Sequence, residues 1–490
     1  MTDLREIRPS FNGSVRLEGR PERLTSSPGA LVLREVIERL DLGAYFEEQL
    51  LDPRDPELVT HPFQELILTM VLLFGQGFRD QDDADWLRHD AAMKLAASAR
   101  RGTAPLERRA PPDDGGWPSK NPPVPDGLAS QPTLSRLVSA LSSEHNRRGL
   151  RRSLLEVAAR RLRAQRDGHR IRYVTIDLDS LPIEVHGSQE GSAYNGHYHA
   201  RIFHPLIASI AETGDLLDMK LREGTAHTAA GGLDFLLPLL DQVEGKLCQV
   251  ASVRIDAGFP EENLLAPLEQ RRTGYVARVK NNAVLNRMAE PFLKRPPGRR
   301  PQEPRTWFYE MTYQAESWSR ERRVVLVVLE REGELFLHHF WLITNWTEDQ
   351  VSAEDLLAMY RRRGVAEGHF GELMSVLHPA LSSAVRTKTH YRGQTPVTRT
   401  QPIKPFANNE VLMLLHGLAY NVMHCARVLT EQASGQGWGL QRFRDMVLRA
   451  PARIIVHAHY ATVVLGEATA ALWQSLWSRL TTLHISLQPG

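Results

Sequence analysis

About the first hundred residues alternate between hydrophobic and polar positions with a period near 3.6 residues, which is typical of helices that bury one face. The pattern predicts helices over Leu31–Leu40, Pro62–Gly75 and Asp82–Ala97. From Arg101 to Pro132, proline, glycine and charged residues replace it, so we expect a loop or linker there. We therefore predict a helical N-terminal region over residues 1–130 that ends in this linker.

A second helical pattern follows the linker over residues 131–170. Between Arg147 and Arg166 it contains eight arginines and one acidic residue, Glu156. Leucine, valine and alanine recur at helical spacing through the same stretch, which indicates a basic amphipathic helix. A phosphate backbone is one partner for such a helix, and a solvated helix face is the alternative. The candidate DNA contacts on this helix are Arg147, Arg148, Arg151 and Arg152.

Residues 171–290 consist of short runs rich in β-branched residues, separated by two helical stretches. The predicted order is strand, strand, strand, helix, strand, helix, strand. This order is typical of the ribonuclease H-like fold, an α/β fold with a mixed sheet and flanking helices, in which the first and fourth strands lie side by side. The first strand contains YVTIDLDS and the fourth ends in SVRID, so we expect Asp179 and Asp256 to meet at one sheet edge.

Alternating apolar and polar runs over residues 291–345 predict a strand-rich insertion. The spacing agrees, because 111 residues separate Asp256 from Glu367, far more than one connection needs. Residues 346–385 are expected to form the helix that carries Glu367 and completes the ribonuclease H-like domain. The pattern over residues 386–490 predicts a C-terminal helical region with a long apolar helix, a strand pair and a final amphipathic helix.

Composition excludes several classes of protein. Hydrophobic residues make up 42% and charged residues 24% of the chain, and the net charge is +2, as in a soluble protein of several domains. Cys248 and Cys425 form no CxxC pair, so neither a disulfide framework nor a cysteine zinc site is expected. The apolar stretch Leu66–Phe74 is about half as long as a membrane span, and the N-terminus lacks the apolar core of a signal peptide. We expect a cytoplasmic protein with no membrane partner.

Three carboxylates on separate elements are the candidate catalytic and metal-binding residues: Asp179, Asp256 and Glu367. Carboxylate oxygens are ligands for Mg²⁺, and a pair of such ions promotes in-line attack on a phosphodiester. Asp177 and Asp179 alternate with Leu178, so both point to one side of the strand. Asp177 is therefore the alternate first carboxylate.

Basic and aromatic residues accompany the third carboxylate. On an ideal helix Tyr360, Arg363, Glu367 and Met374 lie within about 60° of one another. Arginines beside a metal-carboxylate site suit scissile and flanking phosphates, so Tyr360 and Arg363 are candidate DNA contacts. Lys280, which closes the predicted fifth strand, is a further candidate.

Five motifs together resemble the DDE transposases of bacterial insertion sequences, closest to insertion-sequence family thirteen-eighty within the IS-four-like superfamily. In order they are IDLDS, GSQEGSAYNGHY with FHPLIA, RIDAGFP, YRRRGVAEGHFGEL and PFANNEVLMLLHGLAYNVMH, which span most of the chain. The Tyr, Arg and Glu of the superfamily signature fall on Tyr360, Arg363 and Glu367, whereas its Lys position holds Met374. The resemblance also favours Asp179 as the first catalytic residue.

The resemblance implies a cut-and-paste DNA transposase. It would use two Mg²⁺ ions per active site, with Mn²⁺ as a substitute. The helical N-terminal region would bind double-stranded DNA at the terminal inverted repeats, target DNA would be the second partner, and a homodimer would form the synaptic complex at the nucleoid. Two alternatives stay open: a ribonuclease H-like nuclease without strand transfer, and a domesticated DNA-binding protein without catalysis.

Two other groups of residues have candidate roles. Relatives stack an extruded base on a tryptophan of the strand-rich insertion, which makes Trp318 a candidate, with core packing as the alternative. His197, His199 and His204 cluster in YHARIFHP, but no further ligand completes a zinc site. Turn or DNA-proximal roles are preferred for these histidines.

Overall fold

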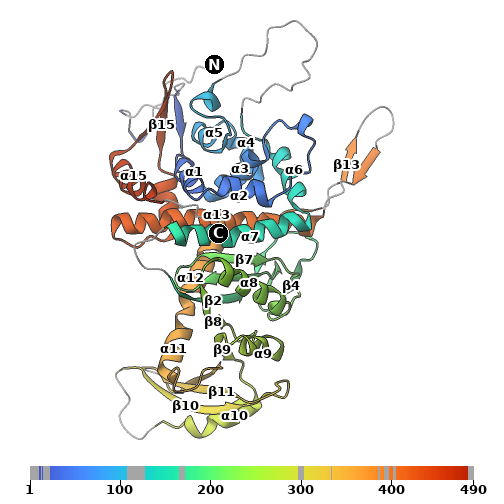
Figure 1. Cartoon of the computed structure of the whole chain (residues 1–490), viewed down its shortest axis with the longest axis vertical. Coiled ribbons are helices and arrows are strands. Elements are labelled where there is room, and N and C mark those ends of the chain that lie inside the picture. The colour runs from blue at the N-terminus through green and yellow to red at the C-terminus, as the bar shows by residue number, and fades with distance from the viewer. Residues whose placement is uncertain are drawn as a thin grey trace.

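The computed structural model describes residues 10–12, 14, 22–107, 127–164, 171–295, 303–332, 334–384, 387–390, 397–400 and 404–483. The molecule is elongated, with a helical body at one end and an α/β body at the other (Figure 1). Two long helices, α7 (Glu144–Ala164) and α13 (Pro405–Ser434), run side by side between the two bodies.

The helical body combines segments from both ends of the described chain. Val36, Leu72, Met423 and Trp473 belong to one hydrophobic core, and strand β1 (Arg23–Thr25) pairs with β15 (Ala452–Val456). Residues 1–130 and 386–490, predicted as separate regions, thus contribute to one body. Its other elements are α1 (Ala30–Arg39), α2 (Leu42–Gln49), α3 (Phe63–Gly75), α4 (Ala84–Leu87), α5 (Ala91–Ala97), α6 (Gln131–Leu141), α14 (Leu440–Phe443), β16 (Ala461–Leu465) and α15 (Glu467–Leu480).

The predicted N-terminal helices are largely found. α1 and α3 confirm the first two, whereas the third, over Asp82–Ala97, is divided into α4 and α5. The break occurs at Asp90, whose carboxylate accepts a hydrogen bond from the backbone N–H of Met93 at 2.9 Å. An aspartate in this position caps a new helix and therefore favours the division.

α13 is the central helix of the molecule. By length and composition it could cross a membrane, but 94% of its most apolar window is buried inside the protein. It contacts α3 and α7 as well as α15, so it is the core helix around which the helical body packs.

Two buried histidines on α13 should make stability depend on pH. Burial lowers the pKa of His416 to about 4 and that of His424 to about 3. In the unfolded chain both rings titrate at a pKa of about 6.5, so the unfolded state binds more protons below that pH. We therefore expect the free energy of unfolding to fall as pH falls from 6.5 toward 4, by about 1.4 kcal/mol per pH unit for each histidine.

Urea unfolding between pH 7 and pH 5 measures this effect. His416→Leu is the control variant, because leucine keeps an apolar group against Phe74, whose ring stacks on His416 at a centroid distance of 3.6 Å. The variant should lose one histidine's share of the pH dependence. Equal slopes in the variant and the unaltered protein would contradict the prediction.

The α/β body is built on an eight-stranded sheet of order β10-β11-β12-β9-β8-β2-β6-β7. β2 and β8 are parallel neighbours, and β6 runs antiparallel to β2 on its other side. The predicted adjacency of the first and fourth strands is thereby confirmed. The five predicted strands and two helices are β2 (Tyr173–Ser180), β6 (Leu206–Ile210), β7 (Leu216–Lys220), α8 (Gly232–Lys246), β8 (Gln249–Ile255), α9 (Glu262–Gln270) and β9 (Gly274–Val279).

The strand-like segment RIFHPLIASIA, which is the second in the predicted order, is divided at Pro205 into two strands. Proline cannot donate to a strand ladder, so it interrupts a central strand. Its first half becomes β5 (Ala200–Phe203), which forms a separate small sheet with β3 (Ile183–Glu184) and β4 (Ala193–Asn195).

The strands of the insertion extend the main sheet. β10 (Arg305–Tyr313), β11 (Arg322–Glu330) and β12 (His338–Thr344) form an antiparallel meander, and β12 pairs with β9. Tyr275 of β9 and Trp341 of β12 belong to one hydrophobic core. The segment predicted as a strand-rich insertion therefore continues the main sheet through the pairing of β12 with β9. Helix α10 (Ala283–Ala289), ahead of it, was not predicted.

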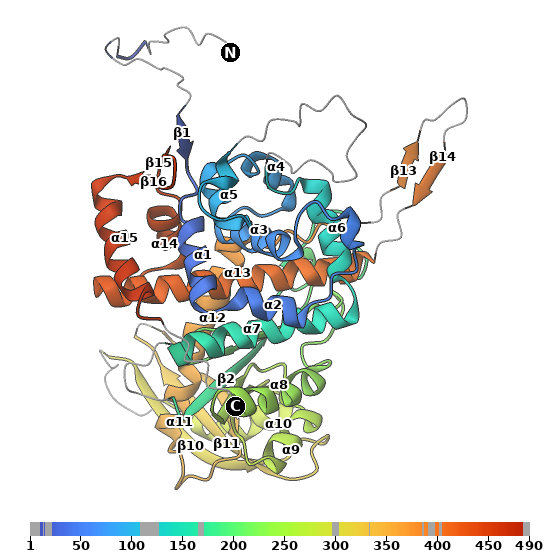
Figure 2. The ribbon, with the colours of Figure 1, turned by 45° about the horizontal axis from the view of Figure 1, so that its top comes forward.

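The helix predicted to carry Glu367 is divided into two. α11 (Ala353–Arg361) begins at Ser352, whose hydroxyl accepts a hydrogen bond from the N–H of Asp355 at 3.1 Å. α12 (Arg363–Glu372) follows and ends in a π-helical turn, Leu373–Leu377. A hairpin of β13 (Thr387–His390) and β14 (Val397–Thr400) then projects from the body before α13 (Figure 2).

Candidate active site

The two predicted aspartates emerge at the same sheet edge. Leu178 of β2 and Ile255 of β8 are partners in the parallel register. Asp179 and Asp256 are the next residues on these strands, and side chains at the carboxyl ends of parallel neighbours meet in one crevice. Asp256 starts a turn there, because its carbonyl accepts a hydrogen bond from the N–H of Phe259 at 3.1 Å.

Arg363 joins the third carboxylate to the first. Its Nη2 lies 2.6 Å from Oδ2 of Asp179, and its Nη1 forms an ion pair with Glu367 one turn along α12. Burial opposes the charge of Arg363, but Asp179, Asp256 and Glu367 outweigh it and raise the pKa of the guanidinium. The structure thus brings Asp179 and Glu367 into contact with one buried arginine and places Asp256 within electrostatic range of it.

The pKa of Asp179 depends on its burial and on the charges of this cluster. Burial raises the pKa of Asp179 to about 6, Arg363 and the N–H of Ser180 oppose the shift, and Asp256 and Glu367 add repulsion. A cation between the carboxylates would relieve that repulsion, and an all-oxygen donor set suits Mg²⁺. Among the residues that the structure describes, no three acidic, histidine or cysteine side chains lie close enough to bind an ion without movement. The Arg363 guanidinium lies between Asp179 and Glu367 and pairs with both.

Asp177, the alternate first carboxylate, has a different environment. Both of its oxygens accept from Arg254, at 2.6 Å each, and both residues are buried. Arg254 also donates to the carbonyl of Met359 in α11 at 3.0 Å. This pair therefore fastens β2 and β8 to α11, which leaves Asp179 as the better candidate ligand.

Tyr360 lies within electrostatic range of Asp256 and Glu367. Burial raises its pKa, and the charges that act on it include Arg363, Asp256, Arg278 and Glu367. Arg278 was not identified from the sequence, although it lies on β9 two residues before Lys280 and hence on the same face. Both basic residues are exposed, and the Arg278 guanidinium lies 5.2 Å from the centre of the Phe340 ring.

Trp318 does not lie where the sequence interpretation placed it. Its side chain is 5% exposed and belongs to the core of the α/β body. The Tyr313 ring packs against it at a centroid distance of 5.5 Å, and the Arg322 guanidinium lies 5.1 Å above its ring. The base-stacking role is therefore wrong, because no ring face is open to a base, and the core-packing alternative holds.

The basic helix α7 is a packing element rather than an open basic face. Arg147 pairs with Glu410 of α13, Arg151 with Asp218 of β7 at 2.8 Å, and Arg152 with Gln49 of α2 at 3.1 Å. Arg148 differs, because its side chain is 66% exposed and pairs with Glu144 on the same helix. The expectation that all four arginines contact DNA is corrected accordingly, since three of them join α7 to its neighbours.

We expect Arg151→Ala to lower stability, because it leaves the buried Asp218 carboxylate without its partner. The salt dependence of DNA binding should stay unchanged. Arg148→Ala should change the free energy of unfolding by less than about 0.5 kcal/mol and remove at most one phosphate contact, worth about 0.9 in the slope of log K against log salt. Urea unfolding measures the stability of each variant, and a salt titration measures its DNA binding. A flatter slope of log K against log salt for Arg151→Ala would restore the interpretation that Arg151 contacts DNA.

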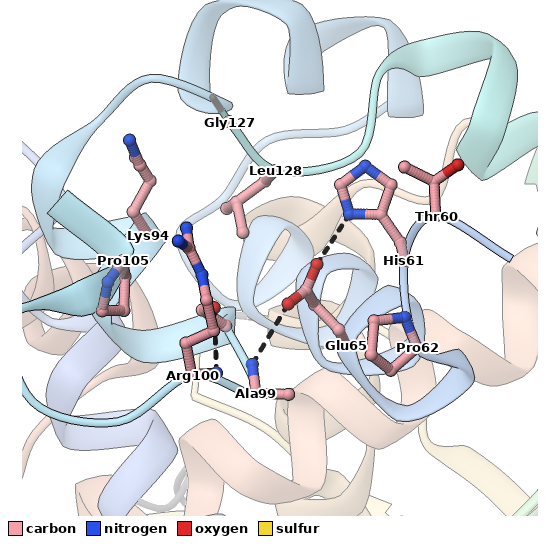
Figure 3. A pocket seen from close by; sticks show the side chains of 11 residues that line it. Thr60, His61, Pro62, Glu65, Lys94, Ala99, Arg100, Pro105, Gly127 and Leu128 are labelled. Carbon is pink, nitrogen blue, oxygen red and sulfur yellow. Dashed lines mark hydrogen bonds and ion pairs between the residues drawn. The ribbon is translucent and has the colours of Figure 1, made fainter. Parts of the chain in front are cut away.

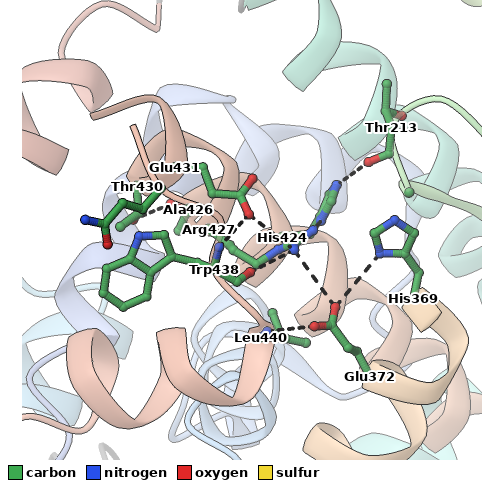
Figure 4. A network of polar contacts seen from close by, with 12 residues as sticks. Thr213, His369, Glu372, His424, Ala426, Arg427, Thr430, Glu431, Trp438 and Leu440 are labelled. Atoms are coloured by element: carbon green, nitrogen blue, oxygen red, sulfur yellow. Dashed lines mark hydrogen bonds and ion pairs between the residues drawn. The ribbon is translucent and has the colours of Figure 1, made fainter. Parts of the chain in front are cut away.

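A polar network fastens the end of α12 to α13 (Figure 4). Glu372 accepts a hydrogen bond from the N–H of Leu440 at 2.9 Å and lies 4.0 Å from Arg427. Arg427 donates to Nδ1 of His424 at 2.8 Å. Since arginine only donates, His424 keeps its proton on Nε2 and donates it to the carbonyl of Thr213 at 2.8 Å. The network thus joins the helix that carries the third carboxylate to α13 and to the β6–β7 turn.

Met374 occupies the position at which the superfamily signature has a lysine. It lies in the π-helical turn after α12 and packs, partly buried, against the core of the helical body.

A pocket of about 320 Å³ lies in the helical body, away from the carboxylates (Figure 3). Glu65 at its centre already accepts from Nδ1 of His61 at 2.7 Å and from the N–H of Ala99 at 3.1 Å. Because these contacts satisfy the carboxylate, we assign the pair to the stability of the fold.

The chain matches one known protein family over most of its length. The sequence profile of the family described as "Transposase DDE domain group 1" matches residues 7–485. No curated protein matches the chain. Among solved structures, the chain is similar to "Cryo-EM structure of piggyBac transposase synaptic complex with hairpin DNA (SNHP)", with 11% sequence identity and a TM-score of 0.37, over 94% of this chain and 85% of that chain.

Proposed function

Since the chain belongs to the DDE transposase family, group 1, we propose that it excises a DNA element and joins its ends to a new site by a cut-and-paste mechanism. The observation that carries the proposal is the convergence of Asp179, Asp256 and Glu367 on Arg363 at one edge of the sheet. The strand order and the resemblance support a ribonuclease H-like catalytic domain and a place in bacterial insertion-sequence family thirteen-eighty.

In this proposal the three carboxylates would bind two Mg²⁺ ions, with Mn²⁺ as a substitute. Bound there, the ions would activate the attacking water or 3′-hydroxyl and stabilise the leaving oxygen. Arg363 balances Asp179 and Glu367 in the present structure, and we assign it to the scissile phosphate once those carboxylates have other partners. Tyr360, Arg278 and Lys280 lie along the same edge and suit the flanking phosphates.

The proposed partners are double-stranded DNA and a second copy of the chain. The helical body would bind the terminal inverted repeats, target DNA would enter at the carboxylate edge, and a homodimer would bring two ends together in the cytoplasm at the nucleoid. Because the helical body contains both N-terminal and C-terminal segments, recognition would use both ends of the chain.

Paired inverted repeats in the DNA that flanks the gene provide the substrate for a test. A supercoiled plasmid that carries both ends, incubated with the protein and Mg²⁺, should be cut at each end, and the ends should be joined to target DNA. Cutting without joining would favour the nuclease alternative. Binding without cutting would favour a DNA-binding protein that has lost catalysis.

A further inference from the structure

The loop that joins β7 to α8, residues 221–231, lies at the catalytic edge of the sheet. β6 is antiparallel to both β2 and β7, so β7 runs parallel to β2 and ends on the same side as Asp179. The loop also packs against the turn that follows Asp256, since a Cβ on Gly258 would lie 2.6 Å from Cγ2 of Thr228. Ligands of open α/β sheets bind outside the carboxyl ends of the strands. The loop therefore lies where the proposed DNA substrate would pass.

A buried arginine without a carboxylate partner lies behind this loop. Arg222 is 8% exposed, its Nη2 has no hydrogen-bond partner, and no acidic side chain in the described part of the chain forms an ion pair with it. Burial lowers the pKa of this guanidinium to about 10. In other buried arginines, carboxylates outweigh burial and raise the pKa, as in Arg161, Arg322 and Arg363. A buried charge is costly unless dipoles or a ligand compensate it, so Arg222 leaves an unbalanced positive charge behind the loop.

The guanidinium fixes the direction of three peptide groups in the loop. Nη1 of Arg222 donates, at 2.7 to 3.0 Å, to the carbonyls of His227, Thr228 and Ala230. The peptide bonds of the described residues are trans, and in a trans peptide the C=O and the N–H point in opposite directions. The N–H groups that consequently point away from the guanidinium are those of Thr228, Ala229 and Gly231. None of these three N–H groups donates a hydrogen bond to another described residue.

The three N–H groups lie at the start of α8, where a helix favours an anion. Neighbouring N–H groups in a turn form an anion-binding concavity, and the positive end of the helix dipole adds to their effect. The N-cap residue, Gly231, has no side chain to occupy these donors. Among nearby acidic residues, Glu223 is at the start of the loop and Asp234 of α8 lines a separate pocket beside α7. Glu261 lies 3.7 Å from the ring of His227. The loop therefore offers unpaired donors, with a positive charge behind them, to a negatively charged ligand.

We propose that the three N–H groups of this loop bind a backbone phosphate next to the scissile phosphate of the DNA end. Arg222 is a positioning residue in this site: it turns the peptide groups outward and supplies positive charge from behind them, without contact with the DNA. Backbone N–H groups bind phosphate irrespective of base sequence, so the contact fixes the register of the strand over the carboxylates. The inference rests on the proposed function and adds a second phosphate position beside the one assigned to Arg363.

A matched pair of substitutions at Ala230 tests the site. Ala230 is exposed and adjoins the three N–H groups. Ala230→Asp places a carboxylate beside them, and Ala230→Asn has nearly the same size without the charge. On duplexes that end in the element's terminal repeat, with Ca²⁺ in place of Mg²⁺, Ala230→Asp should bind roughly 10- to 100-fold more weakly than Ala230→Asn, the range expected for hydrogen bonds to a charged group. Its slope of log K against log salt should be flatter by about 0.9, which corresponds to one phosphate contact.

Methylphosphonate linkages identify the phosphate. Each linkage removes the negative charge of one phosphate, and it is placed in turn at every position around the cut. At one position next to the scissile phosphate, the unaltered protein should lose affinity by roughly 10-fold or more. On that duplex Ala230→Asp and Ala230→Asn should bind equally, because the charge that the carboxylate repels is gone. At positions outside the site, the difference between the two variants should persist.

The same duplexes test the role of Arg222. Arg222→Lys keeps the positive charge and should retain the loss of affinity at that methylphosphonate position. Arg222→Gln keeps a donor for the loop carbonyls without the charge and should reduce that loss. A residue that only supports the fold would instead weaken binding to every duplex by the same factor, and this result would remove Arg222 from the site.

The possible outcomes separate the two proposals. Equal binding of the two Ala230 variants to unmodified DNA would overturn the inference and leave the proposed function in place. A difference between them that persists at every methylphosphonate position would show general repulsion, and it would overturn the inference as well. If the unaltered protein binds no duplex that carries the element ends, the proposed function fails and the inference fails with it.

Discussion

Replacement of any one of the three carboxylates should abolish DNA cleavage and leave recognition of the element ends intact. We expect Asp179→Asn, Asp256→Asn and Glu367→Gln each to reduce the cleavage rate by about 10³-fold or more, because each removes a charge on which the metal site depends. Binding should persist or become tighter, since one negative charge fewer faces the phosphates. Cleavage of a supercoiled plasmid with paired ends, in Mg²⁺ and in Mn²⁺, measures the first effect, and a gel-shift titration measures the second.

A matched control is available on the neighbouring helix. Glu354 is an exposed glutamate of α11, and Glu354→Gln should cleave at the rate of the unaltered protein. Full activity in Glu367→Gln would remove the assignment of the third carboxylate. Loss of binding together with cleavage in all three variants would show damage to the fold instead of the chemistry.

Asp177→Ala should unfold the protein more easily, in contrast to Asp179→Ala. Removal of Asp177 leaves the buried guanidinium of Arg254 without its carboxylate, and breaking a buried pair from one side costs about 3–5 kcal/mol. Removal of Asp179 leaves Arg363 paired with Glu367 and relieves repulsion among the carboxylates, so stability should change by about 1 kcal/mol or less. Urea unfolding of both variants at neutral pH, without divalent ions, makes the comparison.

The conservative variant Asp177→Asn separates structure from chemistry. Asparagine keeps an acceptor for Arg254, so part of the stability and part of the cleavage activity should return. If Asp177→Asn is as stable as the unaltered protein but fails to cleave, Asp177 is the first catalytic carboxylate and our assignment is reversed.

The pattern of apolar and polar residues was sufficient to predict the strands at the centre of the main sheet. The strands that carry Asp179 and Asp256 are short and rich in β-branched residues, and their adjacency followed from the order of elements. Nothing in the local residue pattern indicates that α11 and α12 are separate helices. Propensity is nearly uniform across Arg361, Arg362 and Arg363. The two helices have different distant partners, because Met359 of α11 accepts from Arg254 whereas Arg363 of α12 donates to Asp179.

The wrong predictions for Arg151 and Trp318 have one physical cause. Arg151 and Trp318 were judged by local pattern, in which an arginine-rich helix resembles a DNA-binding face and a tryptophan in an insertion resembles a stacking platform. Whether either residue is exposed depends on tertiary partners, Asp218 and Arg322, which lie on other elements. Arg278 was missed for the same reason, since only the placement of β9 beside β8 brings it toward the carboxylates.

The shared core of the helical body has a consequence for synthesis on the ribosome. The end of α1 and the start of α13 are 366 residues apart in the chain, so at a synthesis rate of about 5–20 residues per second roughly 20–70 s pass between them. During that interval the apolar faces of α1 and α3 have no α13 to cover them. The N-terminal segment should therefore need a chaperone until α13 is synthesised, and a transcript cut short before α13 should yield an aggregating fragment without the complete helical body.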